Sequence, residues 1–149
     1  MNRVLAAAYV ILLVAALTAI ANVYAAAALS ILANALLCYG WWRYEVGYEA
    51  VRKTFAALAG LAIPLTIAGL LSGFFAFGYW WQIYNLIYIV FHMVTLLLYG
   101  FEKERPVVAA GAFLYGLGAP AALMGAYYLF WAIVLVIAYC LIIAGLVKE

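Results

Sequence analysis

The sequence lacks charge over most of its length. No Asp, Glu, Lys or Arg occurs in three runs of 39, 48 and 42 residues, at positions 4–42, 54–101 and 106–147. Only 8% of the 149 residues are charged, whereas a water-soluble domain is nearer to about 25%. The exposed half of a soluble domain needs ionic groups, so this composition indicates that lipid is the solvent of the chain.

Other residue types are scarce, and each scarcity excludes a class of chemistry. Asp is absent, which removes aspartyl intramembrane proteolysis and Asp-based metal sites. His92 is the only histidine, which excludes a bis-histidine haem or a histidine-rich zinc site within one chain. The two cysteines, Cys38 and Cys140, form no Cys-x-x-Cys motif, and no nucleophile–base pair or phosphate-binding loop is present. We therefore expect no enzyme activity, no cofactor and no resident metal.

The charge-free runs predict six helices. A transmembrane helix needs about 20 apolar residues, so each run is long enough for a hairpin of two. The sequence thus predicts an all-α transmembrane domain over residues 1–149, a polytopic bundle of three hairpins. The predicted helices lie at approximately 4–22, 25–42, 54–77, 82–101, 107–125 and 127–147. The predicted turns lie near Asn22, at 78–82 and at 125–127. The first turn is short, so one long bent helix is the alternative there.

The basic residues predict the orientation. In the six-span arrangement the N-terminus, the connectors at 43–53 and 102–106 and the C-terminus lie on one side. That side carries all seven Lys and Arg residues. The positive-inside rule makes it the cytoplasm, so we expect a multi-pass protein of the cell (plasma) membrane with both termini inside. Aromatic residues gather at both predicted interfaces, where their amphipathic rings prefer the headgroup region. The expected inner cluster is Trp41, Trp42, Tyr44, Tyr99 and Phe101, and the expected outer cluster is Tyr79, Trp80, Trp81, Tyr127, Tyr128 and Trp131.

The even-numbered helices end alike. Gly40, Gly100 and Gly145 each close a Leu- or Ile-rich stretch and are each followed three positions later by a Lys or Arg. The odd-numbered helices each begin with an Ala-rich turn. One interpretation is three copies of a hairpin of about 50 residues. The other is the common composition of membrane-helix ends.

Neutral polar side chains replace charge at membrane depth. In the helix at 82–101 they recur at offsets of 0, 3, 7, 10 and 14, which places them on one α-helical face. Asn34 belongs to a shorter stripe on the helix at 25–42. Together the candidate path or contact face comprises Asn34, Asn85, Tyr88, His92, Thr95 and Tyr99. A polar stripe is unfavourable against hydrocarbon, so we expect it to face inward, as interhelical hydrogen bonds, as the lining of a solute path or as part of a cofactor site.

Pro64 and Pro120 lie inside predicted helices that are rich in glycine. Small residues allow close helix packing, and prolines are tolerated where neighbouring helices satisfy the freed carbonyl. The functional alternative is that the prolines break corresponding helices of two repeats and open a cavity at the midplane or at the outer level.

These observations favour a transport, channel or solute-capture protein for a small uncharged or weakly polar solute. The alternative is a non-catalytic accessory subunit of a larger membrane complex, such as a respiratory assembly. The expected partners are the lipid bilayer and either further copies of the chain in a homo-oligomer or unlike membrane subunits. The net charge of +2 is spread among apolar runs, so no nucleic-acid partner is expected.

Cysteine-accessibility labelling tests the orientation. Cysteines introduced at positions 47 and 104 are expected to react from the cytoplasmic side, and a cysteine at position 79 from the outside. Reaction of positions 47 and 104 from opposite sides would contradict the six-span arrangement and favour the long first helix.

Overall fold

The chain folds into six helices. The computed structural model describes residues 2–44, 47–73, 77–125 and 127–148, and within these ranges it contains helices and no strand. The helices are α1 (Asn2–Thr18), α2 (Val23–Arg43), α3 (Glu49–Ser72), α4 (Tyr79–Glu102), α5 (Pro106–Leu123) and α6 (Tyr128–Val147). The prediction of an all-α bundle is confirmed.

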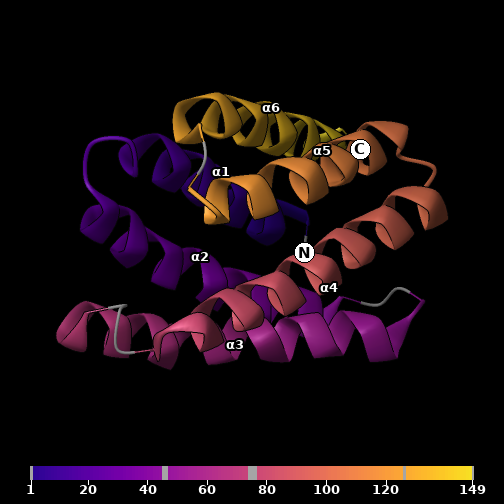
Figure 1. Cartoon of the computed structure of the whole chain (residues 1–149). Helices are drawn as coiled ribbons and strands as arrows, with labels where there is room; N and C mark the ends of the chain where they lie inside the picture. Colours follow the sequence, from indigo (N-terminus) through magenta and orange to yellow (C-terminus); the bar gives the residue numbers. More distant parts are fainter. Residues whose placement is uncertain (1, 45–46, 74–76, 126, 149) are drawn as a thin grey trace.

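The six helices form a closed ring. Each helix packs on its neighbours in sequence, and α6 returns to pack on α1. The turns after α1, α3 and α5 lie at one end of the bundle, on the left in Figure 1, which we call the hairpin end. Both termini and the other two connections lie towards the opposite end, which we call the terminal end. All seven Lys and Arg residues therefore belong to the terminal end. Among adjacent helices, α3 and α4 share the sparsest contact.

The first hairpin consists of two helices and not of one bent helix. α1 ends at Thr18, and the Asn22 side chain caps α2 by accepting hydrogen bonds from the backbone N–H groups of Tyr24 and Ala25, at 3.0 and 3.1 Å. α1 has 17 residues, so it is about 26 Å long, shorter than a hydrocarbon core of about 30 Å. The other five helices are long and apolar enough to cross a membrane. The sidedness of the bundle stays a prediction.

The predicted start of the third helix was wrong by about one turn. α3 begins at Glu49 rather than at residue 54, so only part of the predicted 43–53 connector lies between helices. The reason is Arg52, which is 6% exposed and donates from Nη1 to the carbonyl oxygens of Trp41 and Trp42, the latter at 2.9 Å. The guanidinium thus satisfies carbonyl groups at the end of α2, which have no partner within their own helix. Residues 74–76 and Ala126, which fall at or beside predicted turns, lie outside the described residues.

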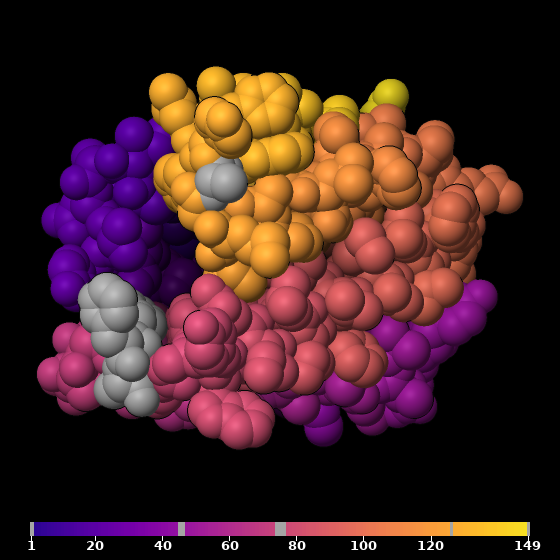
Figure 2. Space-filling model, viewed as in Figure 1, coloured from indigo at the N-terminus to yellow at the C-terminus, as the bar shows by residue number. Residues whose placement is uncertain are grey.

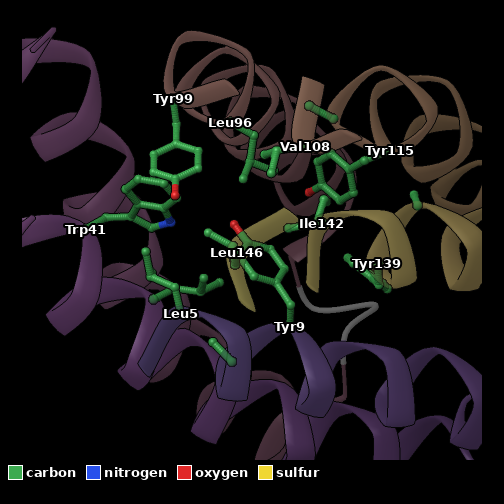
Figure 3. Close-up of a cluster of buried hydrophobic side chains, with 14 of the residues drawn as sticks. Leu5, Tyr9, Trp41, Leu96, Tyr99, Val108, Tyr115, Tyr139, Ile142 and Leu146 are labelled. Atoms are coloured by element: carbon green, nitrogen blue, oxygen red, sulfur yellow. The ribbon is translucent and has the colours of Figure 1, made fainter. Parts of the chain in front are cut away.

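Two of the aromatic residues expected at the inner headgroup level were misplaced, Trp41 and Tyr99, whereas Trp42 and Phe101 are 50% and 71% exposed, in agreement with the expectation. Trp41 and Tyr99 are 0% and 2% exposed and pack edge to face with ring centroids 5.8 Å apart (Figure 3). They belong to the core and not to an interfacial belt. At the hairpin end the expectation agrees better with the structure, since Tyr79, Trp80 and Tyr127 are each more than three-quarters exposed.

Buried positions recur along the odd-numbered helices. The recurrent sets are Leu5, Ala8, Tyr9 and Ala15 in α1; Arg52, Phe55, Ala56 and Ala62 in α3; and Val108, Gly111, Ala112 and Gly118 in α5. This spacing is usual for bundle helices. When α3 and α5 are aligned on these buried positions, however, Pro64 of α3 coincides with Pro120 of α5. The two prolines therefore occupy corresponding positions.

The glycine contacts support the repeat for two hairpins only. A Cβ at Gly40 would meet Leu5 and a Cβ at Gly145 would meet Val108, and these two partners occupy corresponding positions in α1 and α5. Gly100 instead approaches Ala109 in α5, a helix of the following hairpin. The first and third hairpins are thus alike, and the second departs from them. A rough three-fold relation of all three hairpins stays a prediction.

Two glycines of α5 offer a test of close helix packing. In Gly111→Ala the new Cβ would lie 2.8 Å from the carbonyl oxygen of Ala138 and 3.1 Å from the backbone nitrogen of Ile142, so α5 and α6 must separate. We expect the free energy of unfolding to fall by about 1–3 kcal/mol. In Gly116→Ala the new Cβ meets only the flexible Met93 side chain, so the loss should be smaller. Thermal unfolding of both purified variants measures the difference, and equal losses would contradict it.

Candidate functional site

The centre of the bundle is occupied by His92. Its side chain is fully buried, and its Nε2 lies 2.7 Å from the Tyr9 hydroxyl oxygen, with which it shares a hydrogen bond. Phe55 stacks on the imidazole with centroids 4.4 Å apart, and Tyr115 meets it edge to face at 4.5 Å. In the described residues α1 and α4 have no close backbone contact. The Tyr9–His92 hydrogen bond therefore joins two helices across the ring.

One nitrogen of His92 is unsatisfied. Nδ1 is buried and has no hydrogen-bond partner among the described residues. A neutral imidazole has one donor and one acceptor nitrogen, so either tautomer leaves one polar atom unpaired. No three His, Cys, Asp or Glu side chains gather in the described part of the chain. The histidine is thus held by one hydrogen bond and by aromatic rings.

The structure brings together two stripes that the sequence suggested. The Tyr88 hydroxyl donates to Oδ1 of Asn34 at 2.6 Å, which links α4 to α2. Asn34 in turn donates from Nδ2 to the carbonyl oxygen of Ser30 at 2.8 Å. Tyr88 also meets His92 edge to face, with ring centroids 5.6 Å apart. Asn34, Tyr88 and His92 therefore form one connected group.

Among the described residues, the other members of the predicted face do not join this group through side-chain hydrogen bonds. Asn85 donates from Nδ2 to the carbonyl oxygen of Trp81, and Thr95 donates from Oγ1 to that of Phe91, each at 2.7 Å and each within α4. Tyr99 is buried against Trp41. The stripe therefore faces inward in part, but it does not form a continuous polar path along the bundle.

A cavity of about 500 Å³ opens at the hairpin end. All six helices contribute side chains to its wall, and seven of the twenty lining residues are alanine, so small side chains account for much of the open space. None of the lining residues is charged; Thr66 and Ala119 lie close in sequence to the two helix-internal prolines. Figure 2 shows a dark recess on this side, between the indigo surface of α1 and α2 and the orange surface of α5.

The cavity is closed towards the terminal end. His92, Tyr9 and Phe55 are fully buried and do not line it, and beyond them Leu5 and Trp41 are fully buried as well. A second gap, lined in part by residues of the terminal end, measures about 10 Å³, which is room for about one water molecule. In the described residues the cavity thus lies on the hairpin side of a fully buried aromatic group.

Sequence reasoning missed the aromatic partners of the site. Tyr9, Tyr115 and Tyr139 were not considered because only neutral polar stripes and interfacial rings were used as signals. A usable signal was present: each of these tyrosines lies well inside a charge-free run. A tyrosine hydroxyl away from the interface needs a hydrogen-bond partner within the protein, and this predicts an inward orientation.

Comparison with known proteins identifies no relative. No family model matches the chain, and no curated protein or solved structure is significantly similar to it. The structure itself defines the class: a helical membrane protein with several apolar helices of spanning length and a cavity that opens at one end of the bundle.

A double-mutant cycle tests the central hydrogen bond. Tyr9→Phe leaves Nε2 of His92 unpaired, and His92→Leu leaves the Tyr9 hydroxyl unpaired. We expect each single variant to lose about 1–3 kcal/mol of unfolding free energy, because a buried polar group stays unsatisfied. The double variant removes both groups, so its loss should be clearly less than the sum. Thermal unfolding measures the cycle, with the exposed Tyr79→Phe as control; additive losses would contradict the hydrogen bond.

Proposed function

We propose that the protein captures or transports a small uncharged or weakly polar solute, and that the cavity at the hairpin end is its binding site. The observation that carries the proposal is the cavity itself, with side chains from all six helices and a closed end. Its volume falls within the range of about 300–1,000 Å³ that is usual for small-molecule sites.

The lining supports an uncharged solute. No lining residue carries a formal charge, so an ionic solute would lose its hydration without gaining a charged partner. The polar side-chain groups that are present are hydroxyls, one carboxamide and one indole N–H, and groups of these kinds hydrogen-bond to neutral molecules. If the positive-inside rule holds for this chain, the cavity faces the outside of the cell.

The closed end supports alternating access rather than an open channel. A solute in the cavity meets the fully buried group of Tyr9, Phe55 and His92. Movement of these rings requires the helices around them to rearrange. The sparse contact between α3 and α4 and the corresponding prolines Pro64 and Pro120 make this half of the ring the natural place for such a rearrangement.

A cavity-filling substitution tests the proposal. Ala119 lines the cavity, so Ala119→Leu reduces its volume, whereas Ala110→Leu adds the same group to an exposed position of the same helix. In proteoliposomes we expect at least one member of a labelled panel of alcohols, polyols and amides to enter faster than into protein-free liposomes. Ala119→Leu should lower that rate by about tenfold, and Ala110→Leu should leave it unchanged.

Two outcomes would overturn the proposal. One is a panel in which no uncharged solute enters or binds above the protein-free control. The other is an uptake rate that Ala119→Leu does not change. Stable co-purification with unlike membrane subunits, together with either of these outcomes, would support the accessory-subunit alternative instead.

A further inference from the structure

Two buried tyrosines of the cavity have unused hydroxyl groups. Tyr115 of α5 and Tyr139 of α6 are 3% and 7% exposed, and both line the cavity. Their ring centroids are 6.0 Å apart, and Figure 3 shows them on the neighbouring helices α5 and α6. Neither hydroxyl has a hydrogen-bond partner among the described residues. They thus form a pair of neighbouring polar groups in the cavity wall.

Other tyrosines inside the bundle behave differently. The hydroxyls of Tyr9, Tyr88 and Tyr84 bond to His92, Asn34 and the carbonyl oxygen of Leu58 respectively. A buried tyrosine hydroxyl usually finds such a partner, because an unsatisfied one loses its hydration without compensation. The hydroxyls of Tyr115 and Tyr139 are therefore free to bond to a molecule in the cavity.

A third lining hydroxyl shows the same property. Thr66 of α3 is 5% exposed and lines the cavity, and its hydroxyl has no hydrogen-bond partner among the described residues. Thr54 and Thr95 instead donate to carbonyl oxygens four residues earlier in their own helices. Hydroxyls from three helices are thus open to a ligand that carries a hydrogen-bonding oxygen.

The rest of the wall sets the chemistry of the ligand body. Towards the hairpin turns the cavity is lined mainly by small or aliphatic side chains, among them Ala19, Val23 and Ala122. These groups offer dispersion contacts and apolar burial but no side-chain hydrogen bonds. Trp81, Asn85 and Tyr128 add polar groups to this end of the wall, so the site combines hydroxyls at Tyr115 and Tyr139 with a lining towards the hairpin turns that is mainly, but not wholly, apolar.

We propose that the ligand is an uncharged amphiphile, an acyclic hydrocarbon chain with one terminal hydroxyl or carbonyl oxygen, and that it binds with this oxygen on the Tyr115–Tyr139 pair. The inference rests on the proposed function and narrows its solute class. The tyrosine hydroxyls both donate to and accept from the ligand oxygen. The hydrocarbon chain lies along the alanine-rich wall towards the hairpin end.

Binding to the full chain in lipid nanodiscs tests the ligand class. Tritiated farnesol is the probe, with empty nanodiscs as the correction for partition into lipid. We expect saturable binding of farnesol and competition by dodecanol. The affinity of dodecanol relative to that of farnesol shows whether the site prefers straight-chain or isoprenoid alcohols. The oxygen-free hydrocarbon of the same skeleton and the farnesoate anion should compete at least about tenfold more weakly, and glycerol should not compete.

Hydroxyl deletion tests the binding orientation. Tyr115→Phe and Tyr139→Phe remove one oxygen each and preserve the ring. Each should weaken farnesol binding about three- to tenfold and leave competition by the oxygen-free hydrocarbon unchanged. Tyr79→Phe, at an exposed position, is the matched control and should bind as the unaltered chain does. Thermal unfolding establishes that each variant is folded.

The outcomes separate this inference from the proposed function. In one outcome, the Tyr115→Phe/Tyr139→Phe double variant binds farnesol unchanged while Ala119→Leu abolishes binding. This outcome overturns the contact between the ligand oxygen and the two tyrosines and supports the cavity as the binding site. Binding that Ala119→Leu does not alter overturns both. Absence of saturable binding by farnesol and dodecanol overturns the amphiphile class, while uptake from the panel of neutral solutes still supports the proposed function.

Discussion

The hydrogen bond between Tyr9 and His92 reflects a constraint that shapes the whole bundle. Six helices in a ring leave a space on the axis that the backbones do not fill, since α1 and α4 face each other without close contact. Long planar side chains close this space, and Phe55 and Tyr115 pack on the imidazole from two further helices. Away from water the polar tips of such side chains gain stability by pairing within the protein, as Tyr9 and His92 do across the ring. The central pair thus joins the two halves of the ring.

Side-chain size then divides the bundle into two parts. Towards the terminal end the axis is filled by Leu5, Trp41 and Leu96, which are fully buried, and glycines such as Gly145 allow close approach of the helices. Towards the hairpin end alanines face the axis, and a cavity replaces the core. The side chains that face the axis are mainly apolar in both parts. The difference between a sealed end and an open end is therefore one of volume and not of hydropathy.

This distinction explains what the sequence could predict and what it could not. The charge pattern located all six helices, and Asn22 located the first turn, because charges and caps act locally. The periodicity of the polar residues predicted that one face of α4 points inward, and His92 on that face is buried. The sequence did not show which of the apolar residues are buried, because a membrane bundle has apolar side chains both in its core and on its lipid-facing surface. Trp41 was therefore assigned to an interface, and Arg52 was left in a connector although it satisfies the end of α2.

Tyr115 lies between the cavity and the fully buried aromatic group beneath it, and both contain polar atoms without a partner among the described residues. Tyr115 lines the cavity with a free hydroxyl and also packs edge to face on His92, whose Nδ1 has no partner in the described residues. A ligand oxygen that bonds to Tyr115 therefore acts on a ring that is in direct contact with the buried aromatic group. A ligand shifts a conformational equilibrium only through interactions that differ between the two states. Under the proposed function, a ligand that bonded to these hydroxyls at only one position of the rings would supply such a difference.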